Sequence, residues 1–208
     1  MKIRIQNTRI AFTQALFEAK ARNAGEKPAW SSTFILEGKG DHEVEVQAAD
    51  GTTADGKAKF KWVKRKLSQV LSDVATQKWG AKGEAILKSI KLNNAICLRD
   101  GDAKPGYDGF PGNMFLSGRN PKTAPLVLGK NGQPVTESSG VVYAGCFVHA
   151  VLDIYAQDND YGRRINCGIQ TVMFAKDGDS FGGGGRGSAD DFGDLTVPSD
   201  DGFDDLAA

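Results

Sequence analysis

Aromatic, cationic and amide side chains alternate with small apolar residues in two segments, 141–155 and 163–176. In 141–155 every even position from Val142 to Ile154 is apolar, which is typical of a strand with one buried face. The opposite faces of the two segments carry Tyr143, Phe147, His149, Asp153, Tyr155, Arg164, Asn166, Gln170, Phe174 and Lys176. Rings that stack on unpaired bases and cations that neutralise phosphates are the groups that bind single-stranded nucleic acid.

The loop AQDNDYG at 156–162 joins the two segments and predicts an antiparallel hairpin. The predicted core positions of the second strand are Ile165, Cys167, Ile169 and Met173. Buried parallel strands would be apolar on both faces, so a half-exposed face favours an antiparallel sheet or barrel. Five-stranded barrels of the OB type use such a surface to bind single strands. The alternative is that Tyr143, Phe147 and Phe174 form a second core layer under a helix or a long loop.

A glycine-containing loop between 99 and 112 adds further rings. Tyr107 and Phe110 are the leading stacking candidates, because a glycine-flanked loop exposes its rings without a structural reason. The full set of stacking candidates is Trp30, Tyr107, Phe110, Phe115, Tyr143, Phe147 and Phe174. The candidates for phosphate contacts are Arg99, Arg119, Lys122, Arg163, Arg164 and Lys176.

The elements that must position these side chains are mostly strands. Residues 2–17 alternate as a long strand, and the change of parity across Gln6–Arg9 predicts a bulge or bend. Further strands are expected at 29–38, 42–48 and 113–119, with turns at 50–56 and 129–134.

One clear helix is predicted over 58–79, with Gly80 as its stop. Its apolar stripe consists of Phe60, Val63, Leu67, Val70, Leu71 and Val74. Its other face carries Lys59, Lys61, Lys64, Arg65 and Lys66. This basic cluster is either a solvated helix face or the flank of a site for a polyanion.

The length of 208 residues predicts one domain with a tail, or at most two small domains. No run of about 18 apolar residues occurs, and MKIRIQNTRI lacks the apolar region of a secretory signal, so no membrane association is expected. Cys97, Cys146 and Cys167 include no CxxC pair, and only two histidines are present. Free thiols in a reducing cytoplasm therefore fit better than a zinc site.

The chain has neither an HExxH motif nor a Walker loop. The segment GGGGRG precedes no predicted helix, so it does not indicate a phosphate-binding loop. Asp100, Asp102 and Asp108 could imitate the carboxylates of a metal-dependent nuclease, but the turn chemistry of Asp-Gly pairs explains them more simply. We therefore predict no catalytic residue, no metal ligand and no cofactor.

The charge is divided between two parts of the chain. Residues 188–208 contain seven aspartates and no Lys or Arg, so 1–187 holds all 26 basic residues and 19 acidic ones. The body thus carries +7 and the tail −7. The 13 residues of 177–189 span about 20 Å as a flexible linker, which is enough to reach a basic groove on a domain of about 16 Å radius. The tail residues that would compete for this groove are Asp190, Asp191, Phe192, Asp194, Asp200, Asp201, Phe203, Asp204 and Asp205.

Several motifs resemble, in their order and spacing, those of the phage single-stranded DNA-binding proteins formerly known as a domain of unknown function. They are RIAFTQALFEAK (9–20), LRDGD (98–102), PGYDGFPGNMFLSG (105–118), YAGCFVHAVLDIYAQDN (143–159) and INCGIQTVMFAKDGDSFGGG (165–184). Two features differ: HEVEVQAADGTTADGKA (42–58) is longer than expected between strand and helix, and the chain ends FDDLAA rather than on a bare Phe.

The resemblance implies a mainly β fold, an OB-type antiparallel five-stranded barrel with one main helix and long loops over 1–176. A glycine-rich linker and an acidic disordered tail then occupy 177–208. It implies binding of single-stranded DNA without sequence preference in phage replication or recombination, in the cytoplasm of the infected bacterial host. The tail would restrain DNA binding and contact phage or host replication proteins, and a homodimer is left open. The competing function classes are a structural or assembly protein of the virion and a metal-dependent nuclease.

Overall fold

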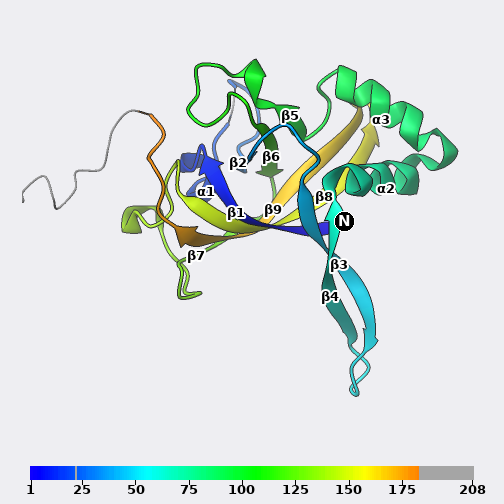
Figure 1. Cartoon of the computed structure of the whole chain (residues 1–208), viewed down its shortest axis with the longest axis horizontal. Coiled ribbons are helices and arrows are strands. Elements are labelled where there is room, and N and C mark those ends of the chain that lie inside the picture. The colour runs from blue at the N-terminus through cyan, green and yellow to red at the C-terminus, as the bar shows by residue number, and fades with distance from the viewer. Residues whose placement is uncertain (22, 183–208) are drawn as a thin grey trace, which may run out of the picture.

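The computed structural model describes residues 1–21 and 23–182 (Figure 1). Its strands are β1 (Lys2–Ala11), β2 (Trp30–Leu36), β3 (Glu43–Thr52), β4 (Ala58–Lys66), β5 (Leu98–Asp100), β6 (Met114–Asn120), β7 (Leu126–Leu128), β8 (Phe147–Asn159) and β9 (Gly162–Lys176). Its helices are α1 (Gln14–Phe17), α2 (Leu67–Trp79) and α3 (Gly83–Leu92). The prediction of a mainly β fold with one main helix is confirmed, and α2 is that helix.

All nine strands belong to one sheet, whose main path runs β5-β6-β2-β1-β8-β9-β7. Two strands lie off this path, since β3 pairs with β1 and β4 pairs with β3. The pair β7–β9 is parallel and the other pairs are antiparallel. The sheet is therefore mixed, and it has more strands than the predicted five-stranded antiparallel barrel.

The sheet curves until β6 approaches β9, although its strand ladder does not close within the described residues. Main-chain bonds through one residue link the two strands: Cys97 N–H donates to the Ile165 carbonyl at 2.9 Å, and Ser117 N–H donates to the Cys97 carbonyl at 3.0 Å. A Cβ atom at Gly118 would lie 2.5 Å from Cγ1 of Ile169, so glycine is required for this approach. The strands β6 and β9, which are distant in sequence, thereby lie close to each other.

The main core lies inside the curve of the sheet and under α2. Four apolar residues at helical spacing on α2 are buried there, namely Leu67, Val70, Leu71 and Val74. They pack with buried residues of the central strands, among them Ile3, Ile5, Phe34, Leu116, Val148, Leu152 and Ile169. No helix within 1–21 and 23–182 is long and apolar enough to cross a bilayer.

The predicted bulge in the first strand is confirmed. The register of β1 against β8 shifts between Ile5 and Thr8. Asn7 in this shift has φ 51°, a left-handed conformation that asparagine tolerates better than most residues. The expected strand 2–17 is shorter than predicted, since β1 ends at Ala11 and Gln14–Phe17 forms α1.

The antiparallel hairpin of β8 and β9 is also confirmed, but the predicted buried face is not confirmed along its whole length. Its first strand begins at Phe147, so 141–146 lie outside it. Val151 pairs with Thr171 and Leu152 pairs with Ile169, which leaves Gln170 as an extra residue in β9. Beyond this bulge, the alternation of core-facing and outward-facing side chains along β9 is reversed. Val172 is therefore buried where Met173 was expected, and Phe174 packs against the core.

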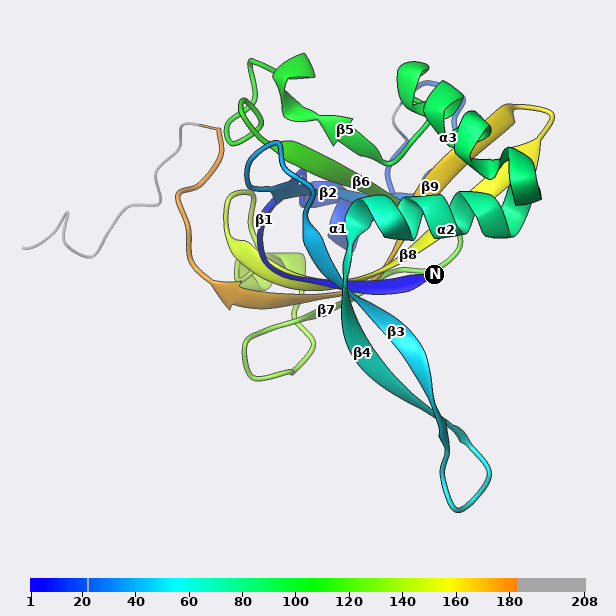
Figure 2. The ribbon, with the colours of Figure 1, turned by 45° about the vertical axis from the view of Figure 1, so that its right-hand side comes forward.

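The prediction of a single helix over 58–79 is wrong in its first half. Residues Ala58–Lys66 form β4, which pairs with β3 from Glu43↔Lys66 to Thr52↔Ala58. Phe60 and Val63 were expected in the core and are 54% and 38% exposed. The turn is also shorter than expected, because β3 continues to Thr52. The two strands form an arm that projects from the body (Figure 2).

The three cysteines, Cys97, Cys146 and Cys167, are buried, and none forms a disulfide within the described residues. Burial raises the pKa of the Cys97 thiol to about 12, so this thiol is neutral at physiological pH and is a poor nucleophile. We expect iodoacetamide at mildly alkaline pH to leave the folded protein unlabelled and to label all three thiols after denaturation, as counted by mass spectrometry. Rapid labelling of the folded protein would show that the core opens.

Candidate nucleic-acid interface

Three of the predicted phosphate-binding arginines line one groove of about 670 Å³. Arg99 comes from β5, Arg119 from β6 and Arg164 from β9. Two tyrosines complete its aromatic wall, Tyr155 of β8 at 39% exposure and Tyr161 of the β8–β9 turn at 82%. We call these five residues and the space between them the arginine groove. Rings and cations thus lie together on an open surface, as single-strand binding requires.

Main-chain carbonyls hold the three guanidinium groups of the arginine groove. Arg99 donates to Ile96 at 3.1 Å, Arg119 to Lys27 at 2.8 Å and Arg164 to Tyr161 at 3.2 Å. None of the three forms an ion pair with another described residue. Their remaining N–H groups can therefore donate to phosphate oxygens without first breaking an ion pair.

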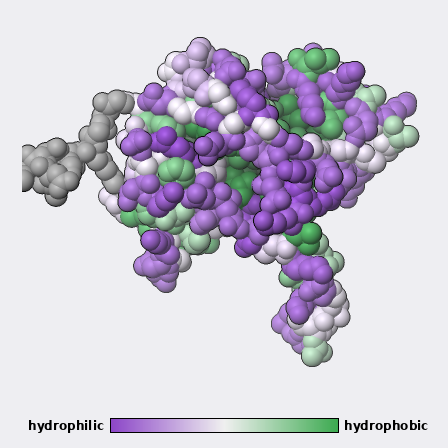
Figure 3. All heavy atoms as spheres, viewed as in Figure 1, coloured by the Kyte–Doolittle hydropathy of each residue, from purple (hydrophilic) through white to green (hydrophobic). Residues whose placement is uncertain are grey.

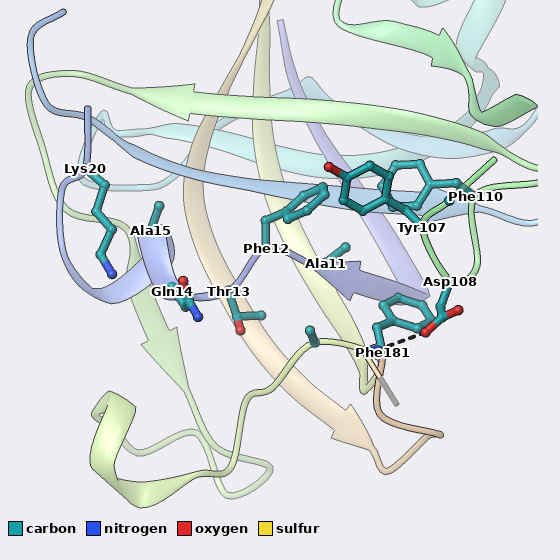
Figure 4. A pocket seen from close by; sticks show the side chains of 13 residues that line it. Ala11, Phe12, Thr13, Gln14, Ala15, Lys20, Tyr107, Asp108, Phe110 and Phe181 are labelled. Atoms are coloured by element: carbon teal, nitrogen blue, oxygen red, sulfur yellow. Dashed lines mark hydrogen bonds between the residues drawn. The ribbon is translucent and has the colours of Figure 1, made fainter. Parts of the chain in front are cut away.

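A second feature, which we call the aromatic cluster, consists of Phe12, Tyr107, Phe110 and Phe115. Figure 4 shows the first three of these rings. Successive ring centroids lie 5.4 Å apart for Phe12–Tyr107, 5.9 Å for Tyr107–Phe110 and 5.1 Å for Phe110–Phe115. The amino group of Lys104 lies 5.0 to 5.7 Å from all four ring centroids. The cluster therefore presents a positive charge together with its rings.

The aromatic cluster forms a wall of a pocket of about 360 Å³. Phe181 and Asp108 lie at one end of the pocket and Lys20 at the other (Figure 4). Phe12 and Tyr107 are 41% and 51% exposed. Phe12 also has φ 58°, a conformation that costs a bulky residue free energy and often marks a functional position. These two rings are the accessible stacking surfaces of the cluster.

Phe110 is not exposed as predicted, and Phe115, a further stacking candidate, is buried as well. Phe110 is 1% exposed and Phe115 is 3% exposed, and both pack in a small second core with Ala11 and Ile35. The glycine-rich loop folds back onto the sheet instead of standing away from it. A Cβ atom at Gly101 would lie 2.0 Å from the Phe110 carbonyl oxygen, which shows how closely the loop packs. Tyr107 alone keeps the role proposed for the loop.

Strand β6 connects the aromatic cluster to the arginine groove. Phe115, Ser117 and Arg119 occupy alternate positions of β6 and therefore share the face opposite Leu116. Phe115 belongs to the aromatic cluster, whereas Ser117 and Arg119 line the groove. Arg99 pairs with Phe115 across the sheet and so lies on the same face. Four residues of strand rise by about 13 Å, so the two features form neighbouring parts of one surface.

The other predicted phosphate contacts are dispersed. Lys122 is exposed just after Pro121, which lines the arginine groove. Arg163 forms an ion pair with Asp158 at 3.2 Å and lines a separate pocket with residues of α3. Trp30, a stacking candidate, is half-buried at the start of β2, opposite Asn120. The structure does not place Arg163 or Trp30 in either feature.

Three further stacking candidates lie on β8, β9 or the segment before them. The Tyr143 hydroxyl lies 3.0 Å from the Asp177 carboxylate and 2.9 Å from the Gly178 carbonyl, which ties the end of β9 to the body. The Phe147 ring lies under the Lys176 amino group at 4.4 Å. Phe174 packs against the main core, as the alternative of a second core layer allows for that ring.

A family model described as Enterobacter phage Enc34, ssDNA-binding protein, matches residues 1–203. The chain belongs to the Enc34 family. A protein named p50 from Acyrthosiphon pisum secondary endosymbiont phage 1 is 34% identical over 203 residues, covering 97% of each chain. The resemblance carried by the sequence motifs is therefore confirmed.

Two solved structures share the fold of this Enc34-family chain. The single-stranded DNA-binding protein from bacteriophage Enc34 in complex with ssDNA is 21% identical, with a TM-score of 0.56, covering 87% of this chain and 89% of the other. A C-terminal truncation of the Enc34 protein is 20% identical, with a TM-score of 0.54, covering 86% of this chain and 87% of the other.

Sequence reasoning missed several residues of this surface. Tyr161, Phe12 and Lys104 were not among the candidates, and Tyr155 was noted only as part of the polar face of its strand. Tyr161 precedes a turn glycine, as Tyr107 follows one, and that signal could have identified it. Phe12 gives no such signal, because its exposure depends on the left-handed turn that ends β1. The predicted tail residues Asp190 to Asp205, with Phe192 and Phe203, lie outside the described residues.

The three aspartates considered for a nuclease have other partners. Lys39 forms ion pairs with Asp100 and Asp102, and its hydrogen bond lowers the pKa of both carboxyl groups. Asp102 accepts from Gly112 N–H at 2.7 Å, and Asp108 accepts from Gly182 N–H at 2.9 Å. Within the described part of the chain, no group of three His, Cys, Asp or Glu residues could hold a metal ion. These carboxylates stabilise the loop of the aromatic cluster.

Proposed function

We propose that this protein binds single-stranded DNA without sequence preference and protects it during phage DNA replication and recombination. The observation that carries the proposal is the arginine groove, where three guanidinium groups that form no ion pair within the described residues meet two exposed tyrosines. The aromatic cluster on the same face supports it by adding Phe12 and Tyr107. Membership of the Enc34 family supports the same ligand.

The chemistry of the surface explains the lack of sequence preference. Every base has an aromatic face that can stack on a tyrosine or phenylalanine, and every nucleotide carries the same phosphate. Three arginine contacts in the arginine groove would release about two counterions, since each contact with a single strand releases about 0.7. Binding should therefore weaken as salt rises. The site of action would be the cytoplasm of the infected bacterium, where phage DNA is copied.

The acidic tail supports a second part of the proposal. The charge of its seven aspartates balances the +7 charge of residues 1–187, and Phe192 and Phe203 lie among these aspartates. We propose that the tail competes with weakly bound nucleic acid for the basic surface and recruits phage or host replication proteins. A tethered competitor acts at an effective concentration on the order of millimolar. Long single strands would displace it because they make more contacts.

We expect residues 1–187 to bind a single-stranded oligonucleotide more tightly than the full chain at low salt, with the difference shrinking as salt screens the tail. A fluorescence anisotropy titration on single-stranded and double-stranded DNA, with both proteins, measures this. Both proteins should prefer the single strand. Weaker or unchanged binding after removal of 188–208 would exclude competition by the tail, and equal affinity for duplex DNA would exclude the stacking mechanism.

A further inference from the structure

The β3–β4 hairpin is a two-stranded arm that projects away from the body of the protein (Figures 1 and 2). Its root is fixed, because Ile3 pairs with Val46 and Leu67 N–H donates to the His42 carbonyl at 2.8 Å. Beyond the root, β4 pairs with β3 alone. The arm includes the segment 42–58 that is longer than the family resemblance leads one to expect. Neither the arginine groove nor the aromatic cluster uses it.

The outer strand of the arm is strongly basic. Among the nine residues of β4, Ala58–Lys66, five are Lys or Arg and none is acidic. Lys61 pairs with Asp50 and Lys64 pairs with Glu43, each at 2.9 Å, but these lysine side chains are 58% and 72% exposed. Exposed ion pairs contribute little to stability and are screened by salt, so phosphates can replace the carboxylates at little cost. Lys59 forms no ion pair with any other described residue.

Rings accompany these cations on the arm. Phe60, Trp62 and Lys64 occupy alternate positions of β4 and share one face. Phe60 is 54% exposed, and Figure 3 shows apolar side chains on the arm among hydrophilic ones. The Arg4 guanidinium lies 4.6 Å from the Trp62 ring centroid and donates to Glu45 at 2.6 Å, which holds the tryptophan in place. The arm thus repeats the combination of rings and cations found in the arginine groove.

The charge of β4 opposes pairing with a second copy of the chain. An antiparallel pair of two β4 strands centred on Trp62 would place Lys59 opposite Arg65, and like charges in that position are destabilising. Lysines on an edge strand are a common means of preventing such association. A polyanion is the partner that this strand attracts.

We propose that the β3–β4 arm is a second contact surface for single-stranded DNA, in which Phe60 stacks on a base while Lys59, Lys61 and Lys64 bind phosphates. This inference rests on the proposed function and extends it beyond the surface of β6, β8 and β9. A strand long enough to reach the arm gains these contacts, whereas a short strand held in the arginine groove does not. The arm would therefore enlarge the number of nucleotides that one molecule covers.

The test compares Phe60→Ala with Val63→Ala in the full chain, on oligo-dT of about 8 and about 30 nucleotides. The shorter length lies within the usual site size of about 4–16 nucleotides for this kind of domain, and the longer one exceeds it. Val63 is a matched control because it is an exposed apolar residue of the same strand that has no ring to stack on a base. We expect Phe60→Ala to weaken binding of the long oligonucleotide about fivefold and to leave the short one unchanged. Val63→Ala should leave both unchanged.

A second variant tests the phosphate contacts. In the double variant Lys59→Ala with Lys61→Ala, the slope of log affinity against log salt concentration should be less steep by about 1.4 for the long oligonucleotide. For the short oligonucleotide the slope should not change. Equal binding of Phe60→Ala and the unaltered protein to the long strand would overturn the proposal, as would an equal loss on both lengths or on duplex DNA. A change in oligomeric mass by light scattering, without loss of affinity, would assign the arm to protein contacts instead. If the unaltered protein binds neither length, the proposed function itself fails.

Discussion

Replacing Arg119 and Arg164 together with alanine is expected to weaken binding of a single-stranded oligonucleotide about 100-fold at low salt. A hydrogen bond from a charged donor contributes about 1.5 kcal/mol, and about 1.4 kcal/mol corresponds to tenfold in Kd. Both side chains line the arginine groove and use only one N–H each on a main-chain carbonyl. The groove has one carboxylate in its lining, Glu26, which accepts from Asn23 at 2.6 Å. Anisotropy with a labelled oligo-dT measures the loss.

The salt dependence separates this site effect from a general loss of charge. The double variant should show a slope of log affinity against log salt that is less steep by about 1.4, because two phosphate contacts are removed. The matched control is Lys88→Ala with Lys130→Ala, which removes two exposed charges outside the groove. An equal loss in the control would mean that only net charge matters. Unchanged affinity of the Arg119 and Arg164 variant would show that DNA follows another path.

The parts of the fold that the sequence predicts are those in which one periodicity is unambiguous. The even positions of 147–155 are all apolar, whereas the odd ones mix aromatic, polar and apolar residues, so the hairpin and its buried face follow directly. The parity change in β1 is equally clear, because Ile3 and Ile5 are followed by Ile10 on the other phase. The facing of Phe174 could not be predicted, since Thr171, Val172 and Met173 satisfy either phase and a bulge at Gln170 chooses between them.

Residues 58–66 are ambiguous for a different reason. Phe60, Val63 and Leu67 lie at helical spacing, while the run AKFKWVKRK also alternates as a strand. The choice depends on β3, which supplies a pairing partner at every position from Val44 to Ala49. A partner that is supplied by another segment cannot be read from the window itself.

The candidate site was predicted in its residue types more than in its geometry. Arg99, Arg119 and Arg164 were chosen as cations near predicted strands, and the close approach of β6 and β9 brings them into one groove. Phe110 was chosen by the glycines around it, which indicate a loop but not the direction in which the loop folds. That direction depends on Asn113, whose amide donates to the Gly109 carbonyl at 2.8 Å and whose oxygen accepts from Gly38 N–H at 2.7 Å. Such contacts join segments that sequence alone does not connect.

Phe110 and Tyr107 lie three residues apart and should respond to alanine substitution in opposite ways. Phe110→Ala is expected to lower the free energy of unfolding by about 3–5 kcal/mol, because it empties a fully buried site between Ala11, Ile35 and Phe115. Tyr107→Ala should leave stability nearly unchanged, since its ring is 51% exposed. It should instead weaken binding of oligo-dT by about 1–3 kcal/mol, the contribution of one stacked base. Chemical denaturation and anisotropy titration of the two variants measure these quantities.

Conservative variants show whether the ring or its burial matters. Tyr107→Phe keeps the stacking surface and should bind DNA nearly as well as the unaltered protein. Phe110→Leu keeps most of the buried volume and should recover much of the stability lost in Phe110→Ala. The Phe110 ring can reach a base only if the loop 101–113 opens, because a 1% exposed side chain offers no face for stacking. If Phe110→Ala retains full stability and loses DNA affinity, the loop opens on binding and Phe110, with Tyr107, belongs to the DNA-contacting surface.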